Sequence, residues 1–460
     1  MEVAEVVARA RAAQSEIAEW DADRVHELTT AVAYAVARKD RAEALARLAV
    51  DEAGFGNYED KVTKIERRVL GVLSDLRETP TVGIVEEDPA RGLVKIAKPV
   101  GVVAGLVPTT GPDATPPVKA LCALAGRNAI VFAAHPRSKR TTDAVVGFMR
   151  EACEQVGAPA DLVQVLPEAK IAYTQELMHQ VDLIVATGGA GMVKAAYSSG
   201  TPAFGVGVGN AVHVVDETAD LADAAAAIVA AKTFDYATSC LADNSVVAHD
   251  SVYDDLVARL TAAGGHVCDD DQKAALQAAM WPDGGEIPTP DVIAKSAPHI
   301  AALAGIDVPA STTFLIVHED GVGHDHPFSG EKLSVVLALY RYSGAIDNAV
   351  AQVNAITGYQ GLGHTCGIHT TSDAHVDALA FGTKTARVLV NQNLNEGAGS
   401  ARNGLPFTLS LSCGTWGGGI TTENVNARHF VNLTWVSRPS VTRRVDAESL
   451  FAAHFDKYGR

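Results

Sequence analysis

Apolar residues recur at every third or fourth position through residues 1–79, a region rich in alanine with little glycine before Gly54. This spacing predicts a series of amphipathic helices. The next segment, TVGIVEEDPARGLVKIAKPVG, has apolar runs on either side of Asp88 and Gly92, with charged residues alternating along it. The pattern predicts a β-hairpin, and its charged faces indicate an arm outside the core.

From residue 100 onward, short apolar runs alternate with helical segments. GVVAGLVP, NAIVFAA, DLVQVLP, DLIVATGG and TPAFGVGVG have the apolar character of buried strands, with helices expected at 115–125 and 141–156. Strands joined by helices in this way predict an α/β fold with a parallel sheet covered on both faces. Open sheets of this kind bind ligands at the carboxyl ends of their strands, so we expect a site there.

A second α/β block is expected from residue 236. Its strand-like runs lie at 245–248, 313–317, 333–339 and 386–391. Residues 281–312 are rich in proline, glycine and aspartate, and are predicted to form a loop-rich excursion. Near the end, RHFVNLTWVS predicts a strand whose exposed aromatic residues suit pairing with the hairpin arm or with another subunit.

The 460 residues are too many for one compact core, so two or three domains are expected. The net charge of -17 argues against a nucleic-acid or anionic-membrane partner, either of which requires a basic footprint. No apolar stretch approaches ~20 residues, and the N-terminus suits neither a signal nor a transit peptide, so no membrane association is expected. Six scattered cysteines without CxxC pairing predict reduced thiols in the cytoplasm and no metal site.

Cys240 is the most informative of these cysteines. It lies in KTFDYATSCLADNSVV, between a predicted helix that ends near Phe234 and the strand SVVAH. Its neighbours Thr238 and Ser239 are small and leave room for a substrate, and loops at domain edges are where catalytic residues concentrate. The residues alone leave two interpretations open, a nucleophilic thiol and a buried structural thiol.

Two glycine-rich segments hold further candidates. Gly188 and Gly189 follow a strand and precede a helix, which would let phosphate oxygens approach a helix N-terminus, although a plain turn fits the composition equally well. His364, in GLGHTCGIH, is predicted to lie in a flexible glycine turn, as a general base or as a surface histidine. The two histidines of GHDHP have no matching ligands nearby, so we do not predict a metal site there.

Taken in order, these segments resemble the CoA-acylating aldehyde dehydrogenases, including the aldehyde-oxidising half of bifunctional aldehyde–alcohol dehydrogenases. The resemblance is carried by KPVGVVAGLVPTTGP, RNAIVFAAHPRSK, ATGGAGMVKAAYSSGTPAFGVGVGN, DETADL, AKTFDYATSC, EKLSVVLALYR, GLGHT, KTARVLVN and LSLSCGTWGGG, collinear from about residue 2 to residue 440. It implies a Rossmann-type cofactor domain, an α/β catalytic domain and a small β oligomerisation arm. Since no alcohol dehydrogenase half follows residue 460, a stand-alone form is expected.

The resemblance also implies domain boundaries. The nicotinamide cofactor-binding domain comprises 1–80 and 99–235, the catalytic domain 236–424, the arm 81–98 and 425–440, and the C-terminal tail 441–460. Exposed strand edges on such an arm are costly in a monomer, so a homodimer or homotetramer is expected.

Residues at matching positions receive roles by the same resemblance. Cys240 is the thiol that attacks the aldehyde, Thr110 and the Cys240 N–H are oxyanion donors, and His364 has a supporting acid–base role. The implied cofactor is NAD or NADP, with coenzyme A as co-substrate. Glu331 holds the nicotinamide ribose. The implied cofactor-binding residues are Pro108, Thr109, His135, Arg137, Gly188, Gly189 and Glu331. Arg137 follows the second strand, where it could meet a 2′-phosphate, so NAD and NADP both stay open.

One departure from hydrolytic aldehyde dehydrogenases concerns deacylation. Those enzymes carry a glutamate that activates water, whereas the matching stretch here, GVGVGN at 205–210, has no carboxylate. Losing a general base slows water attack by about 100- to 10,000-fold, and a thiol needs less help, so acyl transfer to coenzyme A is expected.

The segment GAGSARNGLPFTLS is expected beside the aldehyde pocket, and it carries Arg402 and Asn403 where the bifunctional enzymes that the chain resembles have a different loop. Arginine suits an oxyanion, so they predict an anionic aldehyde, sulfoacetaldehyde, which would give sulfoacetyl-CoA. The alternatives are a solvated Arg402 with acetaldehyde or propionaldehyde as substrate, a hydrolytic enzyme, a biosynthetic enzyme that reduces acyl-phosphates, and an inactive scaffold. The oligomer count, the direction of the reaction and packaging in a compartment stay open.

Overall fold

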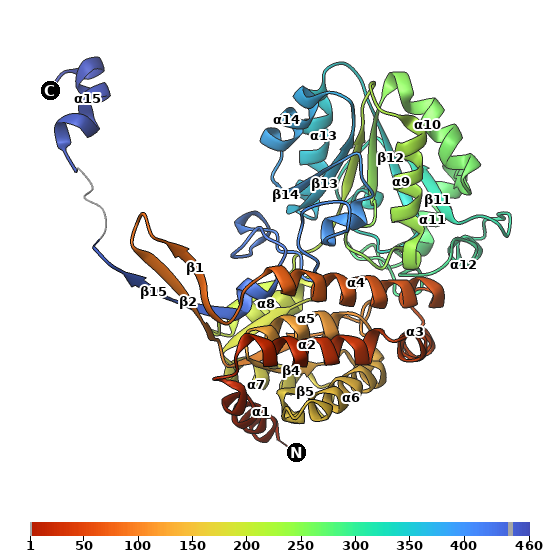
Figure 1. Cartoon of the computed structure of the whole chain (residues 1–460). Coiled ribbons are helices and arrows are strands. Elements are labelled where there is room, and N and C mark those ends of the chain that lie inside the picture. The colour runs from red at the N-terminus through yellow and green to blue at the C-terminus, as the bar shows by residue number, and fades with distance from the viewer. Residues whose placement is uncertain (1, 440–444) are drawn as a thin grey trace.

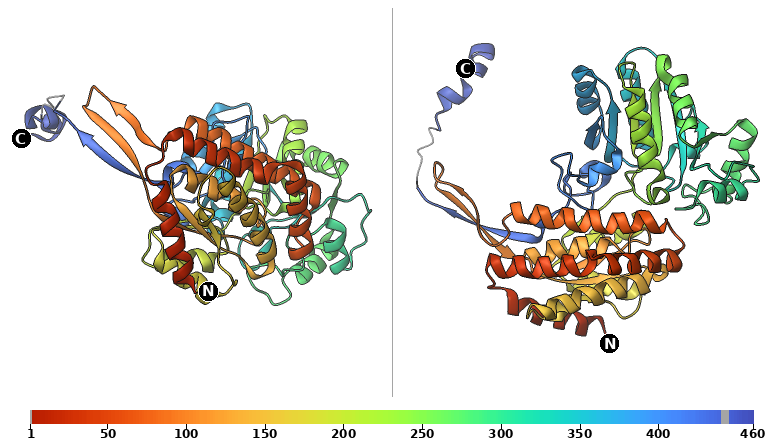
Figure 2. Two further views of the ribbon diagram at one scale, coloured as in Figure 1. Left: turned by 60° about the horizontal axis from the view of Figure 1, so that its bottom comes forward. Right: turned by 45° about the vertical axis from the view of Figure 1, so that its right-hand side comes forward.

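The computed structural model describes residues 2–439 and 445–460. Residue 1, residue 440 of the expected arm and residues 441–444 of the expected tail lie outside the described residues. Two α/β bodies stand one above the other, and a three-stranded arm projects to one side of them (Figure 1, Figure 2). The predicted α/β fold class is confirmed.

The first body is built on a five-stranded parallel sheet in the order β5-β4-β3-β6-β7. Its central strands read as unbroken apolar runs because helices bury both faces. The strands are β3 Val102–Leu106, β4 Ala129–Ala133, β5 Val163–Val165, β6 Leu183–Ala186 and β7 Ala203–Gly205. The covering helices are α5 Thr115–Ala125, α6 Lys139–Gln155, α7 Ile171–Gln180 and α8 Ala190–Ser198.

Four further helices come from the N-terminal region, as its spacing predicted. They are α1 Val3–Ile17, α2 Ala22–Ala37, α3 Lys39–Ala53 and α4 Tyr58–Glu78. Their apolar residues belong to the same core as the five-stranded sheet. Helix α4 lies along the boundary with the second body, which makes it the element best placed to connect the two (Figure 1).

The second body holds a seven-stranded parallel sheet in the order β10-β11-β12-β9-β8-β13-β14. Its strands are β8 Val212–Val215, β9 Ser245–His249, β10 Gly265–Val267, β11 Phe314–His318, β12 Val336–Tyr342, β13 Gly363–His369 and β14 Thr385–Val390. Its helices are α9 Leu221–Thr233, α10 Asp250–Ala262, α11 Asp270–Met280, α12 Ala297–Leu303, α13 Ile346–Tyr359 and α14 Asp373–Gly382. Within the described residues, no helix is long and apolar enough to cross a membrane.

The loop-rich character expected for 281–312 is confirmed, since the seven-residue helix α12 is the one regular element described within it. The structure differs from the sequence expectations in two places. Strand β8 and helix α9 belong to the second body, so the two sheets meet before residue 212 and not at the expected boundary of 235. The segment around His364 is the buried strand β13 and not a glycine turn, because each of its residues is enclosed between neighbouring strands and loops.

The arm consists of β1 Gly83–Asp88, β2 Leu93–Pro99 and β15 Val431–Ser437, paired antiparallel in the order β1-β2-β15. The predicted pairing of hairpin and tail strand is therefore confirmed. Helix α15 (Ala447–Tyr458) lies beyond the arm, away from both bodies (Figure 1).

Asn128 joins the arm to the first body. Its side chain is fully buried, and its Oδ1 accepts hydrogen bonds from the N–H groups of Val100 (2.6 Å) and Gly101 (2.9 Å). Its Nδ2 donates to the carbonyls of Ala123 (3.0 Å) and Phe430 (2.7 Å), just before β15. One amide therefore fixes the end of α5, the start of β3 and the base of the arm.

We expect Asn128→Ala to lower the free energy of unfolding by about 2–4 kcal/mol, because it leaves several buried backbone groups without partners. Chemical denaturation followed by tryptophan fluorescence measures the loss. Asn354→Ala is the control, since Asn354 makes its hydrogen bonds at the surface. Equal small losses in both variants would contradict this account of the junction.

Candidate active site

Two cavities meet at Cys240. The larger, about 540 Å³, lies at the carboxyl ends of the five-stranded sheet, where the open-sheet rule predicts a ligand. The smaller, about 230 Å³, lies against α4. Pro108, Thr110, Thr187 and Cys240 line both cavities, so a ligand in either one reaches the same thiol.

The turn before Cys240 has an unusual backbone. Asp235, Tyr236 and Ala237 all have positive φ, at 49°, 50° and 60°. Residues other than glycine rarely adopt this region, at a cost of about 1–3 kcal/mol each. The turn therefore needs strong anchoring from its surroundings to present the thiol in one position.

Asp235 provides that anchoring through helix α4. Its fully buried carboxylate accepts hydrogen bonds from Lys64 Nζ (2.5 Å) and Lys61 Nζ (3.2 Å). Thr238 Oγ1 (2.8 Å) and the Asn57 N–H (3.0 Å) donate to the same carboxylate. Although burial alone would raise it, the two lysines hold the pKa of Asp235 below its ordinary value. The carboxylate stays charged, and the turn is held by an ion cluster.

Cys240 and His364 form a dyad. His364 lies on β13 and is fully buried, and its Nε2 is 3.2 Å from Cys240 Sγ. Its carbonyl accepts from the guanidinium of Arg387, which also contacts the carbonyl of Ser412 and the side chain of Asn424. The strand and this arginine fix the imidazole against the thiol, so the ring can take the thiol proton.

Both members of the dyad are neutral at rest. Burial, with a further contribution from Glu331, raises the pKa of the Cys240 thiol well above its ordinary value. Burial and the Arg387 cation lower the pKa of His364 to about 3. The proton must therefore move as sulfur attacks, because a resting thiolate–imidazolium pair is disfavoured in this environment.

Donors for a developing oxyanion lie beside the thiol. The Cys240 N–H donates to no backbone carbonyl of the described chain, which leaves it free for a substrate oxygen. Thr110 lines both cavities, and Lys64 Nζ donates to its carbonyl at 3.3 Å, which fixes this loop relative to the Asp235 cluster. This pairing can stabilise a tetrahedral intermediate.

The larger cavity fits a nicotinamide dinucleotide. Gly188 and Gly189 line it in front of α8, whose N-terminus has no side-chain cap, so its free N–H groups suit a pyrophosphate. Glu331 also lines the cavity, and its Oε1 accepts from the Gly209 N–H at 3.0 Å. Burial raises the pKa of Glu331 to about 8, so the carboxyl is mostly protonated at neutral pH and becomes charged as the pH rises toward the range in which the thiol ionises, where it opposes the thiolate.

The other expected cofactor residues divide into two groups. Pro108, Thr109 and His135 line the larger cavity. Arg137 is exposed, and its N–H donates to His135 Nδ1, but it is not part of the cavity lining.

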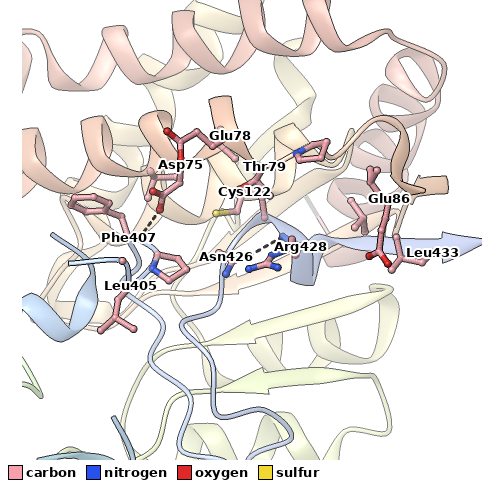
Figure 3. Close-up of a pocket in the computed structure, with 18 of the residues that line it drawn as sticks. Asp75, Glu78, Thr79, Glu86, Cys122, Leu405, Phe407, Asn426, Arg428 and Leu433 are labelled. Carbon is pink, nitrogen blue, oxygen red and sulfur yellow. Dashed lines mark hydrogen bonds between the residues drawn. The ribbon is translucent and has the colours of Figure 1, made fainter. Parts of the chain in front are cut away.

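Arg402 and Asn403 lie away from both cavities. Arg402 is exposed, and its N–H donates to Ser400 Oγ. Asn403 Nδ2 donates to Gln392 Oε1 and Glu396 O, and this residue lines a third cavity of about 560 Å³. That cavity lies between α4, the arm and the 404–407 loop, and does not include Cys240 (Figure 3). The expectation that these two residues line the aldehyde pocket does not agree with the geometry, since the loop turns away toward the arm.

The segment 205–210 passes directly behind the thiol. A Cβ built on Gly209 would lie 2.4 Å from Cys240 Cβ, and one on Gly207 would lie 3.1 Å from Cys413 Sγ. Only glycine fits at Gly209, and the segment offers no carboxylate to activate water.

Several residues of the site could not be found by the motif analysis. Asp235 is more than 170 positions from Lys61 and Lys64 in the sequence, and their cluster forms only when α4 packs against the turn. Arg387 was missed because KTARVLVN reads as an ordinary strand. The one available signal was the spacing of basic residues along α4, which places Lys61, Lys64 and Arg68 on one helical face.

This arrangement defines a dehydrogenase with a cysteine nucleophile, and the chain belongs to the aldehyde dehydrogenase family, whose family model matches residues 1–275. It is 43% identical over 449 residues to the sulfoacetaldehyde dehydrogenase of Acholeplasma sp, covering 97% of this chain and 92% of the relative. It is 42% identical over 463 residues to the sulfoacetaldehyde dehydrogenase (acylating) of Cupriavidus necator, covering 100% of this chain and 93% of the relative.

Solved structures that resemble this protein belong to the same family. The acetylating aldehyde dehydrogenase of Geobacillus thermoglucosidasius superposes with a TM-score of 0.92 at 35% identity, covering 96% of this chain and 97% of that one. The propionaldehyde dehydrogenase of Rhodopseudomonas palustris, with bound CoA and an acylated cysteine, superposes with a TM-score of 0.85 at 27% identity, covering 95% and 97%. The resemblance to acylating aldehyde dehydrogenases noted from the motifs is thus confirmed.

The raised thiol pKa predicts how Cys240 reacts in the ligand-free protein. Its alkylation by iodoacetamide should be slow at pH 7 and should rise about tenfold per pH unit through pH 9, because the thiolate fraction rises in that proportion below the pKa. Mass spectrometry of the labelled peptide measures the rate, with Cys240→Ser as the control for the other thiols. A plateau near neutral pH would instead indicate a resting thiolate–imidazolium pair.

Proposed function

We propose that this protein oxidises sulfoacetaldehyde to sulfoacetyl-CoA, using NAD or NADP and coenzyme A, with Cys240 as nucleophile. The observation that carries the proposal is the Cys240–His364 dyad at the junction of two cavities, one suited to a dinucleotide and one to a small aldehyde. The sulfoacetaldehyde dehydrogenase relatives, similar along almost the whole chain, support the substrate.

The first step joins sulfur to the aldehyde carbon. His364 Nε2 takes the thiol proton as the S–C bond forms, so that no free thiolate has to exist in the buried site. The Cys240 N–H and Thr110 stabilise the oxygen of the resulting thiohemiacetal. The nicotinamide cofactor supplies a hydride acceptor, and oxidation of the thiohemiacetal leaves a thioester on Cys240.

Coenzyme A then removes the acyl group. Transfer exchanges one thioester for another, and a thiol is a better nucleophile than water toward this carbonyl. The imidazole of His364 first releases to solvent the proton that it took from Cys240, and it can then accept the proton of the incoming thiol and return it to the departing Cys240 sulfur. The 205–210 segment carries no carboxylate to activate water in competition. This order agrees with the acylated cysteine and bound CoA named for the Rhodopseudomonas palustris relative.

Either nicotinamide cofactor is compatible with the larger cavity. Within residues 2–439 and 445–460, Glu331 is its single acidic lining residue, and it lies on the thiol side of the site. With no second carboxylate to repel a 2′-phosphate or to hold a 2′-hydroxyl, we propose that the protein accepts both NAD and NADP.

We further propose a homodimer or homotetramer assembled through the arm. Ile84, Leu433 and Trp435 are exposed on the arm, an apolar surface that would be costly in a monomer. A cytoplasmic location is proposed as well, since all six cysteines are free thiols, as in a reducing compartment.

The function is tested with sulfoacetaldehyde, each nicotinamide cofactor and coenzyme A. We expect reduced cofactor and sulfoacetyl-CoA in equal amounts, and omission of coenzyme A should slow turnover by about 100-fold or more, since the 205–210 segment carries no carboxylate to activate water and a thiol is the better nucleophile. Absorbance measures the amount of reduced cofactor and the rate of its formation, and mass spectrometry measures the amount of sulfoacetyl-CoA. Free sulfoacetate made equally fast without coenzyme A would indicate a hydrolytic enzyme.

The assembly is tested by Ile84→Asp on the edge strand β1. A charge placed in a buried interface should shift the molar mass measured by light scattering toward the monomer. Leu303→Asp, at an exposed apolar position on α12, should leave the mass unchanged. A wild-type protein that is already monomeric at micromolar concentration would exclude the proposed oligomer.

A further inference from the structure

The smaller cavity is positively charged. Lys64, Arg67 and Arg68 of α4 line it together with Cys240, and among the residues that the structure describes no aspartate or glutamate lines it. The remaining walls are largely apolar, with Phe234, Leu241, Leu409 and Leu411 among them. A cavity with this lining suits a small ligand with an anionic end.

Two of the three cations are occupied by structural contacts. Lys64 Nζ binds the Asp235 carboxylate and the Thr110 carbonyl. The Arg68 guanidinium donates to the carbonyls of Ala398 (2.7 Å), Gly399 (2.8 Å) and Asn395 (3.0 Å), which holds the 395–399 loop over the cavity. Neither is free to change partners when a substrate binds.

Arg67 is different. Arg67 is an exposed residue that lines the cavity, and its side chain makes no hydrogen bond or ion pair with any part of the chain that the structure describes. Asn393 and Ser239 line the same cavity and use their side-chain oxygens to accept from the Asn395 and Leu241 N–H groups. The Asn393 amide NH₂ and the Ser239 hydroxyl proton therefore remain available as donors.

We propose that Arg67 binds the anionic end of the aldehyde and selects for it, with Asn393 and Ser239 donating to the remaining oxygens. The assignment rests on the proposed function, in which the carbonyl of sulfoacetaldehyde is bound at Cys240. One methylene separates that carbonyl from the sulfonate, and Arg67 shares with Cys240 a cavity of only about 230 Å³. A guanidinium can bind two sulfonate oxygens at once, which a lysine cannot match.

The same geometry argues against the expectation that Arg402 binds the anionic end of the aldehyde. That residue lies on an exposed loop outside both cavities that contain the thiol. If Arg67 binds the anion, substituting Arg67 should change the substrate selectivity and substituting Arg402 should not. If Arg402 binds it, the reverse is expected, so variants of both residues distinguish the two hypotheses.

The test compares Arg67→Gln with Arg77→Gln, the same substitution at an exposed position of the same helix outside the cavity. Initial rates give kcat/KM for sulfoacetaldehyde and for propionaldehyde, a neutral aldehyde. In Arg67→Gln we expect the ratio of the two values to fall about 10- to 100-fold, as for loss of a charged hydrogen bond. Arg77→Gln should keep the wild-type ratio, and Arg67→Lys should recover part of it.

The outcomes separate this inference from the proposed function. An unchanged ratio in Arg67→Gln, or a fall in Arg402→Gln instead, would overturn the role of Arg67 while the wild-type activity on sulfoacetaldehyde stands. A wild-type enzyme inactive on sulfoacetaldehyde but active on succinate semialdehyde would overturn the substrate. Loss of selectivity for that carboxylate in Arg67→Gln would still support an anion site at Arg67.

Discussion

A buried carboxylate held between two lysines is the interaction on which the site depends. Asp235 opens a turn of three left-handed residues that no helix or strand would stabilise, and the thiol follows five positions later. Removing one partner from such a cluster leaves an uncompensated buried charge. The left-handed turn at Asp235 therefore depends on both lysines. The position of the nucleophile is therefore decided by helix α4, which belongs to the other body of the protein.

One basic face of helix α4 both holds the nucleophile turn and lines the smaller cavity. Lys61 and Lys64 hold the nucleophile turn, and Arg68 holds the loop that closes the smaller cavity. Arg67 alone on this face has no structural partner among the described residues, and it lines the cavity that the others build. The cations that hold the site together and the arginine that an anionic substrate would meet are thus different residues of one helix.

The surroundings of the thiol favour concerted chemistry. Burial raises the pKa of Cys240 and lowers that of His364, so both are uncharged until a carbonyl arrives. Gly209 lies so close behind Cys240 that no side chain fits there, and the segment around it carries no base for water. The 205–210 segment therefore both packs against the nucleophile and lacks a carboxylate that could activate water. For both reasons, the acyl-enzyme is expected to react with an incoming thiol.

The sequence by itself determined the α/β alternation, the N-terminal helices, the hairpin with its tail strand, and Cys240 as the candidate nucleophile, because periodicity and turn chemistry are local. The prediction that His364 lies in a glycine turn was wrong, since the burial of β13 comes from the neighbouring strands and not from the residues of GLGHT. The sequence favoured Arg402 for the anion, because the residues of GAGSARNGLPFTLS do not show which way their loop turns in the fold. Only the tertiary structure placed α4 against the nucleophile turn, and with it Arg67 beside the thiol, because contacts between residues more than a hundred positions apart leave no local pattern in the chain.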